Sequence, residues 1–153
     1  MTDIIIEKMA LCHIEEIARL EVECFSVPWS KNALESELDN NFARFYVAFY
    51  NGKIAGYIGA HNVLGEVYIT NVAVFPEFRR KGIAGRLISA LEKKMAEENA
   101  LYITLEVRKT NLSAIALYEK MGFKEVGRRK NFYENPREDA VLMTHYLKSE
   151  IDL

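Results

Sequence analysis

The spacing of hydrophobic residues predicts a strand and two helices in the first forty residues. The run Ile4-Ile5-Ile6 predicts a short first strand. Apolar residues then recur at helical spacing until Pro28, which stops the helix, and Ser30 is placed to cap a second one. The residues that share one face of the first helix are Ile14, Ile17, Ala18 and Phe25.

After residue 43 the hydrophobic period changes to two, which predicts strands. The pair Asn51-Gly52 favours a type I′ hairpin turn, because both central residues of that turn need positive φ. Gly65 allows a second turn, and the almost continuously apolar stretch after it is typical of a central strand. The predicted strands are residues 44–50, 53–63 and 66–75.

In the second half of the chain, strands alternate with helices. A strand, a helix and a further strand in this order predict a parallel pair with a right-handed crossover, and we expect the remaining strands to form a meander. The sequence therefore predicts an α/β fold, with one mixed sheet and helices on its faces. The further elements are helices at 82–98 and 111–121, the latter closed by Gly122, and strands at 101–107, 123–133 and 139–147.

Length and charge exclude several classes of protein. The 153 residues fit one domain, predicted over 1–153 with a frayed tail at 148–153. Twenty basic residues face 22 acidic ones, for a net charge of -2, so we expect no direct binding of nucleic acid. The longest uncharged run, residues 54–65, is too short to span a membrane, and residues 1–7 lack the pattern of a signal peptide.

The two cysteines, Cys12 and Cys24, are too few for a disulfide framework and lack the spacing of a zinc site. We expect them to be reduced thiols in the core of a cytoplasmic protein, and we expect no metal. Both lie on or near the first helix, away from the loop that carries the chemistry, so neither is a candidate nucleophile.

That loop joins the predicted central strand to the long helix, over residues 72–85. Backbone N–H groups at a helix N-terminus bind phosphate well, and glycine lets a ligand approach the backbone closely. Positive charge at this end opposes the helix dipole, a cost that a bound anion would offset. A solvated basic turn explains the same residues equally well. The glycines are Gly82 and Gly85, and the basic residues are Arg79, Arg80 and Lys81.

The run Arg79-Arg80-Lys81-Gly82-Ile83-Ala84 resembles the R/Q-x-x-G-x-G/A motif of the GNAT N-acetyltransferases. The order of elements is similar to that family over nearly the whole chain. The resemblance implies the GNAT fold, a twisted and mostly antiparallel sheet with one parallel crossover and helices on both faces. It also implies that this loop holds the pyrophosphate of acetyl-coenzyme A through backbone amides.

Further segments resemble the RimI subgroup of this family, whose members acetylate the N-terminal alanine of a small-subunit ribosomal protein. Each match is short, and their joint order along the chain carries the resemblance. The matching segments are Pro28-Trp29-Ser30, Leu105-Glu106-Val107-Arg108, the run from Asn111 through Ala114-Ile115-Ala116-Leu117-Tyr118 to Phe123, and Arg137-Glu138-Asp139-Ala140.

The resemblance implies that Glu106 is the general base and that Tyr118 protonates the departing thiolate. From the pattern alone, Glu106 is a strand carboxylate on the polar face, and Tyr118 is a core aromatic on the apolar stripe of its helix. A carboxylate that deprotonates an amine near neutral pH needs a pKa raised by partial burial, or a water that relays the proton.

The same resemblance implies the remaining binding residues. Asn111, which the pattern explains as an N-cap, also contacts the coenzyme. The candidate substrate residues are Trp29, Tyr133 and Asp139, because aromatic and acidic side chains suit the cationic N-terminus of a peptide. Without a substrate, Trp29 is explained as a loop anchor and Asp139 as the partner of Arg137 or Arg128 in a salt bridge. The complete cofactor-binding set is Val72, Ala73, Val74, Arg79, Arg80, Lys81, Gly82, Ile83, Ala84, Gly85 and Asn111.

The sequence thus predicts a transferase that moves acetyl from acetyl-coenzyme A to a protein N-terminal α-amine by direct attack in a ternary complex. We expect a monomer or weak dimer in the cytoplasm whose partner is a ribosomal-protein peptide. Two alternatives stay open. One is a GNAT enzyme that acetylates lysine side chains or a small amine, and the other is a regulatory module that binds coenzyme A without catalysis.

Overall fold

The computed structural model describes residues 3–148 and divides the chain into two compact units. The first unit holds residues 3–61 and 70–91, and the second holds residues 62–69 and 92–148. The single domain over 1–153 stays a prediction. Of the predicted tail only Lys148 is described, with its N–H donating to the Leu101 carbonyl at 3.3 Å, and the rest lies outside the described residues.

Seven strands form one hydrogen-bonded order, β1-β2-β3-β4-β5-β7-β6, with β4 at its centre as predicted. The first unit contains β1 to β3 and the end of β4. The Asn51-Gly52 turn has φ values of 48° and 85° and pairs Tyr50 with Lys53, so the predicted hairpin is confirmed. The strands are β1 (Ile4–Lys8), β2 (Ala43–Tyr50), β3 (Lys53–Val63) and β4 (Glu66–Val74).

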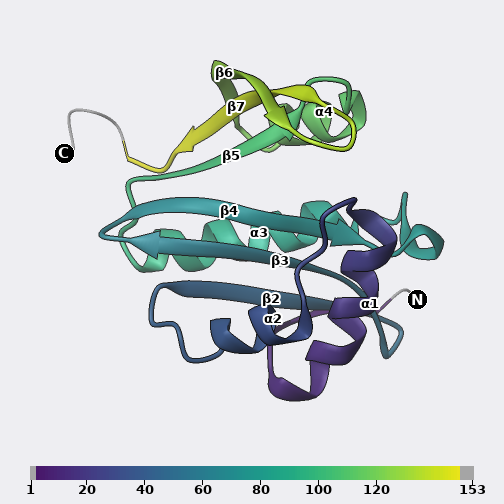
Figure 1. The fold of residues 1–153 in the computed structure, drawn as a ribbon. Helices are drawn as coiled ribbons and strands as arrows, with labels where there is room; N and C mark the ends of the chain where they lie inside the picture. Colours follow the sequence, from purple (N-terminus) through teal and green to yellow (C-terminus); the bar gives the residue numbers. More distant parts are fainter. Residues whose placement is uncertain (1–2, 149–153) are drawn as a thin grey trace. The chain divides into compact units, whose positions relative to one another are not determined.

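Within the first unit, α1 and α2 lie on one face of the strands and the first half of α3 lies on the other (Figure 1). Ser30 caps α2 by accepting from the Ala33 N–H at 3.1 Å, as predicted. The first helix ends at Cys24, before Pro28, and Phe25 is already extended. The helical elements are η1 (Leu11–His13), α1 (Ile14–Cys24), α2 (Lys31–Glu37), η2 (Pro76–Phe78) and α3 (Ile83–Glu97).

The second unit contains the start of β4 together with β5 (Tyr102–Arg108), α4 (Leu112–Lys120), β6 (Lys124–Tyr133) and β7 (Glu138–Tyr146). Strands β4 and β5 pair in parallel, with Val67 opposite Ile103, so the predicted crossover is confirmed. Gly122 follows α4 with a φ of 102°, as expected for a residue that closes a helix.

The expectation that the remaining strands form a meander is wrong in the second unit. Strand β7 lies between β5 and β6 and is antiparallel to both. The reason is geometric, because the connection through α4 returns the chain to the end where β5 began. Strand β6 therefore runs in the same direction as β5, and β7, which follows β6 through a short turn, runs antiparallel to both and fills the position between them.

Strand β5 separates its side chains onto two faces, as the alternation predicts. Ile103, Leu105 and Val107 are buried, whereas Thr104 and Glu106 are only half-buried. Because successive side chains point to opposite faces, Glu106 lies on the more open face of the second unit. This face carries Glu106, the candidate general base.

Two negative findings concern residues 3–148 alone. No helix in this range is long and apolar enough to cross a membrane. No group of three or more His, Cys, Asp or Glu side chains within it is arranged to hold a metal ion.

Candidate active site

Glu106 and Tyr68 form a hydrogen-bonded pair on the open face of the second unit. The Tyr68 hydroxyl, on β4, donates to Oε1 of Glu106 at 3.0 Å. The second oxygen, Oε2, is buried and has no hydrogen-bond partner among the described residues. An acceptor buried without a partner is costly and is retained where a ligand or reactant supplies the missing donor. The carboxylate is therefore held at Oε1, while Oε2 keeps an unused capacity to accept a hydrogen bond.

Tyr68 is 37% exposed, and burial of its hydroxyl end together with the Glu106 carboxylate raises its pKa well above the ordinary value. Burial is the larger cause, because it disfavours the charged phenolate. A raised pKa keeps the hydroxyl protonated at neutral pH, so Tyr68 remains a donor to Glu106 under all ordinary conditions.

Tyr118 lies on α4 and is 9% exposed. Its ring packs 5.8 Å from that of Phe123, centroid to centroid, which agrees with a core aromatic. Burial, with a smaller contribution from Tyr133, raises the pKa of Tyr118 to about 12. The hydroxyl therefore keeps its proton at neutral pH, as a general acid must.

Tyr133 lies at the end of β6 and interacts electrostatically with both Glu106 and Tyr118. Burial raises its pKa to about 12, and the Glu106 carboxylate contributes in the same direction. The Arg108 guanidinium lies 4.5 Å from the centroid of the Tyr133 ring, within the range of a cation–π contact. The second unit thus brings Glu106, Tyr118 and Tyr133 together, as predicted from three separate segments.

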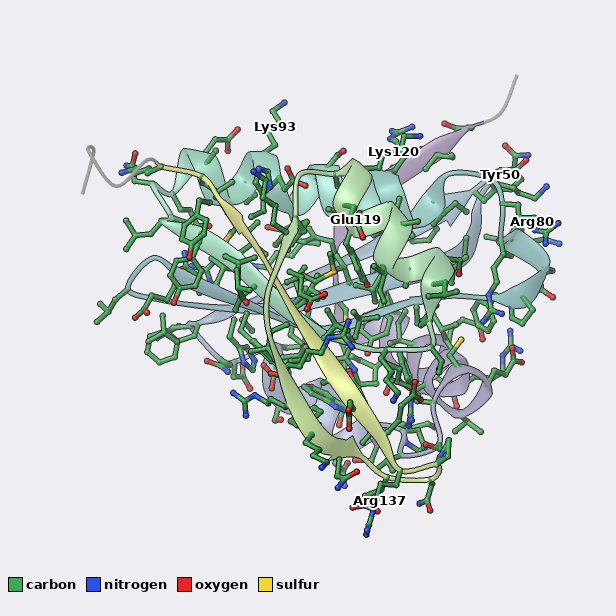
Figure 2. All side chains as sticks on the ribbon, turned by 90° about the horizontal axis from the view of Figure 1, so that it is seen from above. Tyr50, Arg80, Lys93, Glu119, Lys120 and Arg137 are labelled. Carbon is green, nitrogen blue, oxygen red and sulfur yellow. The ribbon has the colours of Figure 1, made fainter. Side chains whose placement is uncertain are left out.

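Arg108 ties the turn between β6 and β7 to β5. Its guanidinium donates to the carbonyls of Pro136 at 2.8 Å and Glu134 at 3.0 Å, and it forms an ion pair with Glu138 at 3.2 Å. The Thr110 hydroxyl donates to the same carboxylate, which lowers the pKa of Glu138, with Arg108 adding to the effect. The whole turn is therefore fixed by one side chain, and Arg137 projects from it (Figure 2).

We expect Arg108→Lys to lower kcat/KM for the acceptor by about tenfold while leaving the fold intact. A lysine keeps the charge but lacks the forked guanidinium that donates to two carbonyls and an ion-pair partner at once. It also has no planar group to stack on the Tyr133 ring. Steady-state kinetics with varied acceptor test this. Arg128→Lys, which changes an arginine bonded to the exposed Glu125, is the control, and equal values for both variants would contradict the role.

The loop of the first unit has the geometry of an anion-binding helix start. Gly82 has a φ of 79°, and a Cβ built on it meets nothing within 4 Å, so the side facing the backbone is open. The first intrahelical bond of α3 runs from the Arg86 N–H to the Gly82 carbonyl at 3.1 Å. The preceding N–H groups of Ile83, Ala84 and Gly85 have no acceptor within the helix and are suited to bind phosphate oxygens.

The three basic residues of the loop are not equivalent. The Arg79 side chain turns back and donates from Nε to the Val74 carbonyl at 3.1 Å. The Lys81 ammonium lies 5.3 Å from the centroid of the Tyr50 ring. Arg80 has a φ of 62° and its side chain points away from the ribbon, beside the label of Tyr50 (Figure 2). Val72 is half-buried and Ala73 is buried, both on β4.

The family model described as Acetyltransferase (GNAT) family matches residues 14–123, which include the loop, Glu106 and Tyr118. The chain belongs to the GNAT acetyltransferase family. This match covers most of the chain and extends over both units.

Relatives within the GNAT family are similar over almost their full length. The ribosomal protein bS18-alanine N-acetyltransferase of Haemophilus influenzae is 34% identical over 146 residues, which are 94% of this chain and 99% of the relative. The crystal structure of the ribosomal-protein-S18-alanine N-acetyltransferase from Escherichia coli has a TM-score of 0.88 at 29% identity, with 96% of each chain covered. Arabidopsis thaliana NAA60, solved with acetyl-CoA, shares the fold, with a TM-score of 0.87 at 19% identity over 96% of this chain and all of that one.

Among the GNAT candidates, Asn111 and Asp139 have backbone roles in the structure. The Asn111 carboxamide accepts from the Ala114 N–H at 3.3 Å, so the predicted N-cap is confirmed. Asp139 accepts from the Asn131 N–H at 2.9 Å and holds a position on β6 whose φ is 53°. Their contacts to coenzyme and substrate stay predictions.

Trp29 lies in the first unit and is anchored by Glu21, a fully buried carboxylate on α1. The backbone N–H of Trp29 donates to Oε1 of Glu21 at 2.8 Å. The opposite oxygen accepts from the Tyr57 hydroxyl at 2.7 Å and from the Asn71 amide at 3.2 Å. The Trp29 ring packs near Phe45, with 6.0 Å between centroids, as a loop anchor would.

The expectations for the cysteines need two corrections. Cys12 is exposed rather than in the core, because it lies in the short helix before α1. Cys24 is half-buried and not remote from the loop, since its thiol donates to the Val74 carbonyl at 3.7 Å and accepts from Arg79 at 3.4 Å. Burial raises the pKa of Cys24, against the smaller effect of Arg79, and this disfavours the nucleophilic thiolate.

The sequence prediction missed Tyr68, Arg108 and Glu21 as functional or organising residues. The almost continuously apolar run of β4 hides Tyr68, although Glu66 and Tyr68 repeat at a spacing of two and mark a polar face. Arg108 ends a matching segment, and nothing in the sequence indicates its contacts. Glu21 lies four residues after Ile17 and next to Leu20, on the apolar face of its helix, and a carboxylate at that position is the signal that could have found it.

Proposed function

We propose that this GNAT enzyme transfers acetyl from acetyl-coenzyme A to the α-amine of a protein N-terminus, the N-terminal alanine of a small-subunit ribosomal protein. The observation that carries the proposal is the Glu106 carboxylate, with one oxygen bound by Tyr68 and the other buried without a partner. The names of the full-length relatives support the choice of acceptor.

In this proposal Glu106 receives a proton from the acceptor nitrogen while that nitrogen forms a bond to the acetyl carbonyl carbon. The carbon–sulfur bond of the thioester breaks, and Tyr118 gives its proton to the departing sulfur. Both residues belong to the second unit, and burial raises the pKa of Tyr118 to about 12, so its hydroxyl holds the proton at neutral pH. No covalent enzyme intermediate is required.

The chemistry of the base favours an α-amine over a lysine side chain. At pH 7 roughly one α-amine in ten is uncharged, against fewer than about one lysine in a thousand. A carboxylate base therefore has to deprotonate a smaller fraction of the acceptor when the acceptor is an N-terminal α-amine. Lysine or small-amine acceptors remain the alternative function, and a module that only binds coenzyme A is the second alternative.

The loop of the first unit fits a coenzyme A pyrophosphate. The N–H groups of Ile83, Ala84 and Gly85 would hold phosphate oxygens, and the outward Arg80 would add charge. Val72 and Val74 would align the pantetheine arm with β4. When bound, the coenzyme supplies the activated acetyl group.

The experiment that tests the function is intact-mass analysis after incubation with acetyl-coenzyme A and two peptides. One begins with a free alanine, and the other has a blocked N-terminus and one internal lysine. A gain of one acetyl group on the first peptide alone is expected. A gain on the second alone would favour the lysine alternative, and coenzyme binding without transfer to either would favour the binding module.

Tyr118→Phe is expected to lower kcat by about tenfold or more with little change in the affinity for coenzyme A, because only the hydroxyl is removed. The acid form of Tyr118 is lost only as the pH rises through its pKa of about 12. An ordinary tyrosine titrates near pH 10, so the basic limb of the wild-type kcat profile should lie above about pH 10. A wild-type rate in the variant would remove Tyr118 from the mechanism.

The proposed acceptor places the enzyme in the cytoplasm, where ribosomal proteins are made. A protein N-terminal peptide is then the partner that the site must recognise. The absence of direct nucleic-acid binding and the monomeric or weakly dimeric state stay predictions, which sedimentation and a gel-shift measurement test.

A further inference from the structure

The two hydrogen bonds between tyrosines and glutamates on the open face of the second unit have similar chemistry but different surroundings. Tyr68 donates to Glu106 at 3.0 Å, and Tyr102 donates to Glu66 at 2.6 Å. Glu66 is exposed, so water can serve both of its oxygens. Glu106 is half-buried, and its oxygen Oε2 is shielded from solvent and has no partner within residues 3–148.

We propose that Tyr68 is a positioning residue for Glu106, and that its hydroxyl, by holding Oε1, sets the orientation in which the carboxylate receives the proton from the acceptor amine. This inference rests on the proposed function, in which Glu106 is the base. Tyr68 acts through the carboxylate and need not touch the acceptor.

Three features of the structure carry the assignment. A carboxylate at the end of a glutamate side chain rotates freely unless one oxygen is fixed, and the hydroxyl on the neighbouring strand supplies the fixed point. The pKa of Tyr68 is raised by burial and by Glu106, which keeps the hydroxyl a donor. Oε2 has no partner within the described residues, so the bond from Tyr68 is the hydrogen bond there that fixes the orientation of the carboxylate.

The charged and titratable groups around the Glu106 carboxylate come from each neighbouring strand. Strand β4 contributes Tyr68, β6 contributes Tyr133 and Arg129, and β5 itself carries Arg108 two residues along. Strand β7 places the uncharged Leu142 opposite Glu106. Tyr68 is the group among these that donates a hydrogen bond to the carboxylate within the described residues.

The test compares Tyr68→Phe with the matched control Tyr102→Phe, which removes a hydroxyl from the same face but from the other glutamate. Loss of a hydrogen bond to a charged group should lower kcat of Tyr68→Phe by about tenfold, with KM for acetyl-coenzyme A changed less than about twofold. Tyr102→Phe should match the unchanged enzyme.

A second readout does not depend on activity. The carboxyl carbon of Glu106, followed by NMR in the whole ¹³C-labelled protein, should change its chemical shift in Tyr68→Phe, because the carboxylate has lost its hydroxyl donor, and should keep it in Tyr102→Phe. If Tyr68→Phe matches Tyr102→Phe in kcat and in the Glu106 chemical shift, the inference is overturned. Thermal unfolding of both variants confirms that each is folded.

The outcomes separate this inference from the proposed function. If the enzyme acetylates only lysine peptides but the Glu106 carboxyl resonance moves in Tyr68→Phe, the positioning role stands and the acceptor is wrong. If Glu106→Gln turns over at the wild-type rate, Glu106 is not the base, and the positioning role falls with it. In a Glu106→Gln background, Tyr68→Phe should cost no further activity, and an additive loss would contradict action through Glu106.

Discussion

Replacing Glu106 by Gln is expected to lower kcat by about 100-fold or more at neutral pH. Gln has nearly the same shape and still accepts the Tyr68 hydrogen bond, but it cannot take a proton from the acceptor nitrogen. The deficit should shrink as the pH rises, because a growing fraction of the α-amine is then already uncharged. A pH series of kcat with an alanine-terminated peptide measures both effects.

Glu66→Gln is the matched control for this prediction. Glu66 lies on the same face and also accepts a tyrosine hydroxyl, so its replacement makes the same change in charge without touching the proposed base. Its kcat should stay within about twofold of the unchanged enzyme. A Glu106→Gln variant whose pH profile parallels that of the unchanged enzyme would contradict the assignment of Glu106 as base.

Replacing Glu21 by Ala is expected to lower the free energy of unfolding by about 3 kcal/mol or more. The fully buried carboxylate accepts from Tyr57, Asn71 and the Trp29 N–H, and its loss leaves all three donors without a partner in the core of the first unit. For a chain of this size the midpoint of thermal unfolding should fall by about 10 °C.

Glu23→Ala tests whether this loss comes from the buried network or from helix α1 itself. Glu23 lies on the same helix and pairs with Arg19 at 2.9 Å, with both side chains largely exposed. Removal of such a surface pair shifts stability by less than about 1 kcal/mol. Calorimetric midpoints of the two variants that agree within about 2 °C would refute the role given to Glu21.

The elements of the chain were predictable because their signals are local. The Asn51-Gly52 turn, the Ser30 cap and the Gly122 helix stop each depend on the φ preference or hydrogen bonding of one or two residues. The inserted position of β7 was not predictable in this way. It depends on which strand edge remains open after α4, and hydrophobic alternation says nothing about the neighbour of a strand.

For the candidate site, the matching segments around Glu106 and Tyr118 named the two chemical groups, and the structure found them in one unit with Tyr133. The partners of these groups could not be read from the sequence. Tyr68 lies 38 positions from Glu106, and the contact depends on the parallel register that sets Tyr68 opposite Thr104. A shift of that register by one residue would turn Tyr68 to the other face.

The sequence by itself determined the order of the elements, the glycines and basic residues of the loop and the residue types at the site, because periodicity, caps and glycine positions act over a few residues. The tertiary structure alone decided which oxygen of Glu106 is held, which turn Arg108 fixes and why Glu21 is buried. The longer of these contacts, from Tyr68 to Glu106, Arg108 to the Glu134 carbonyl and Asn71 to Glu21, join residues 26 to 50 positions apart. They are set by strand register and helix docking, in which the burial of one polar group must be matched by a donor brought from elsewhere in the chain.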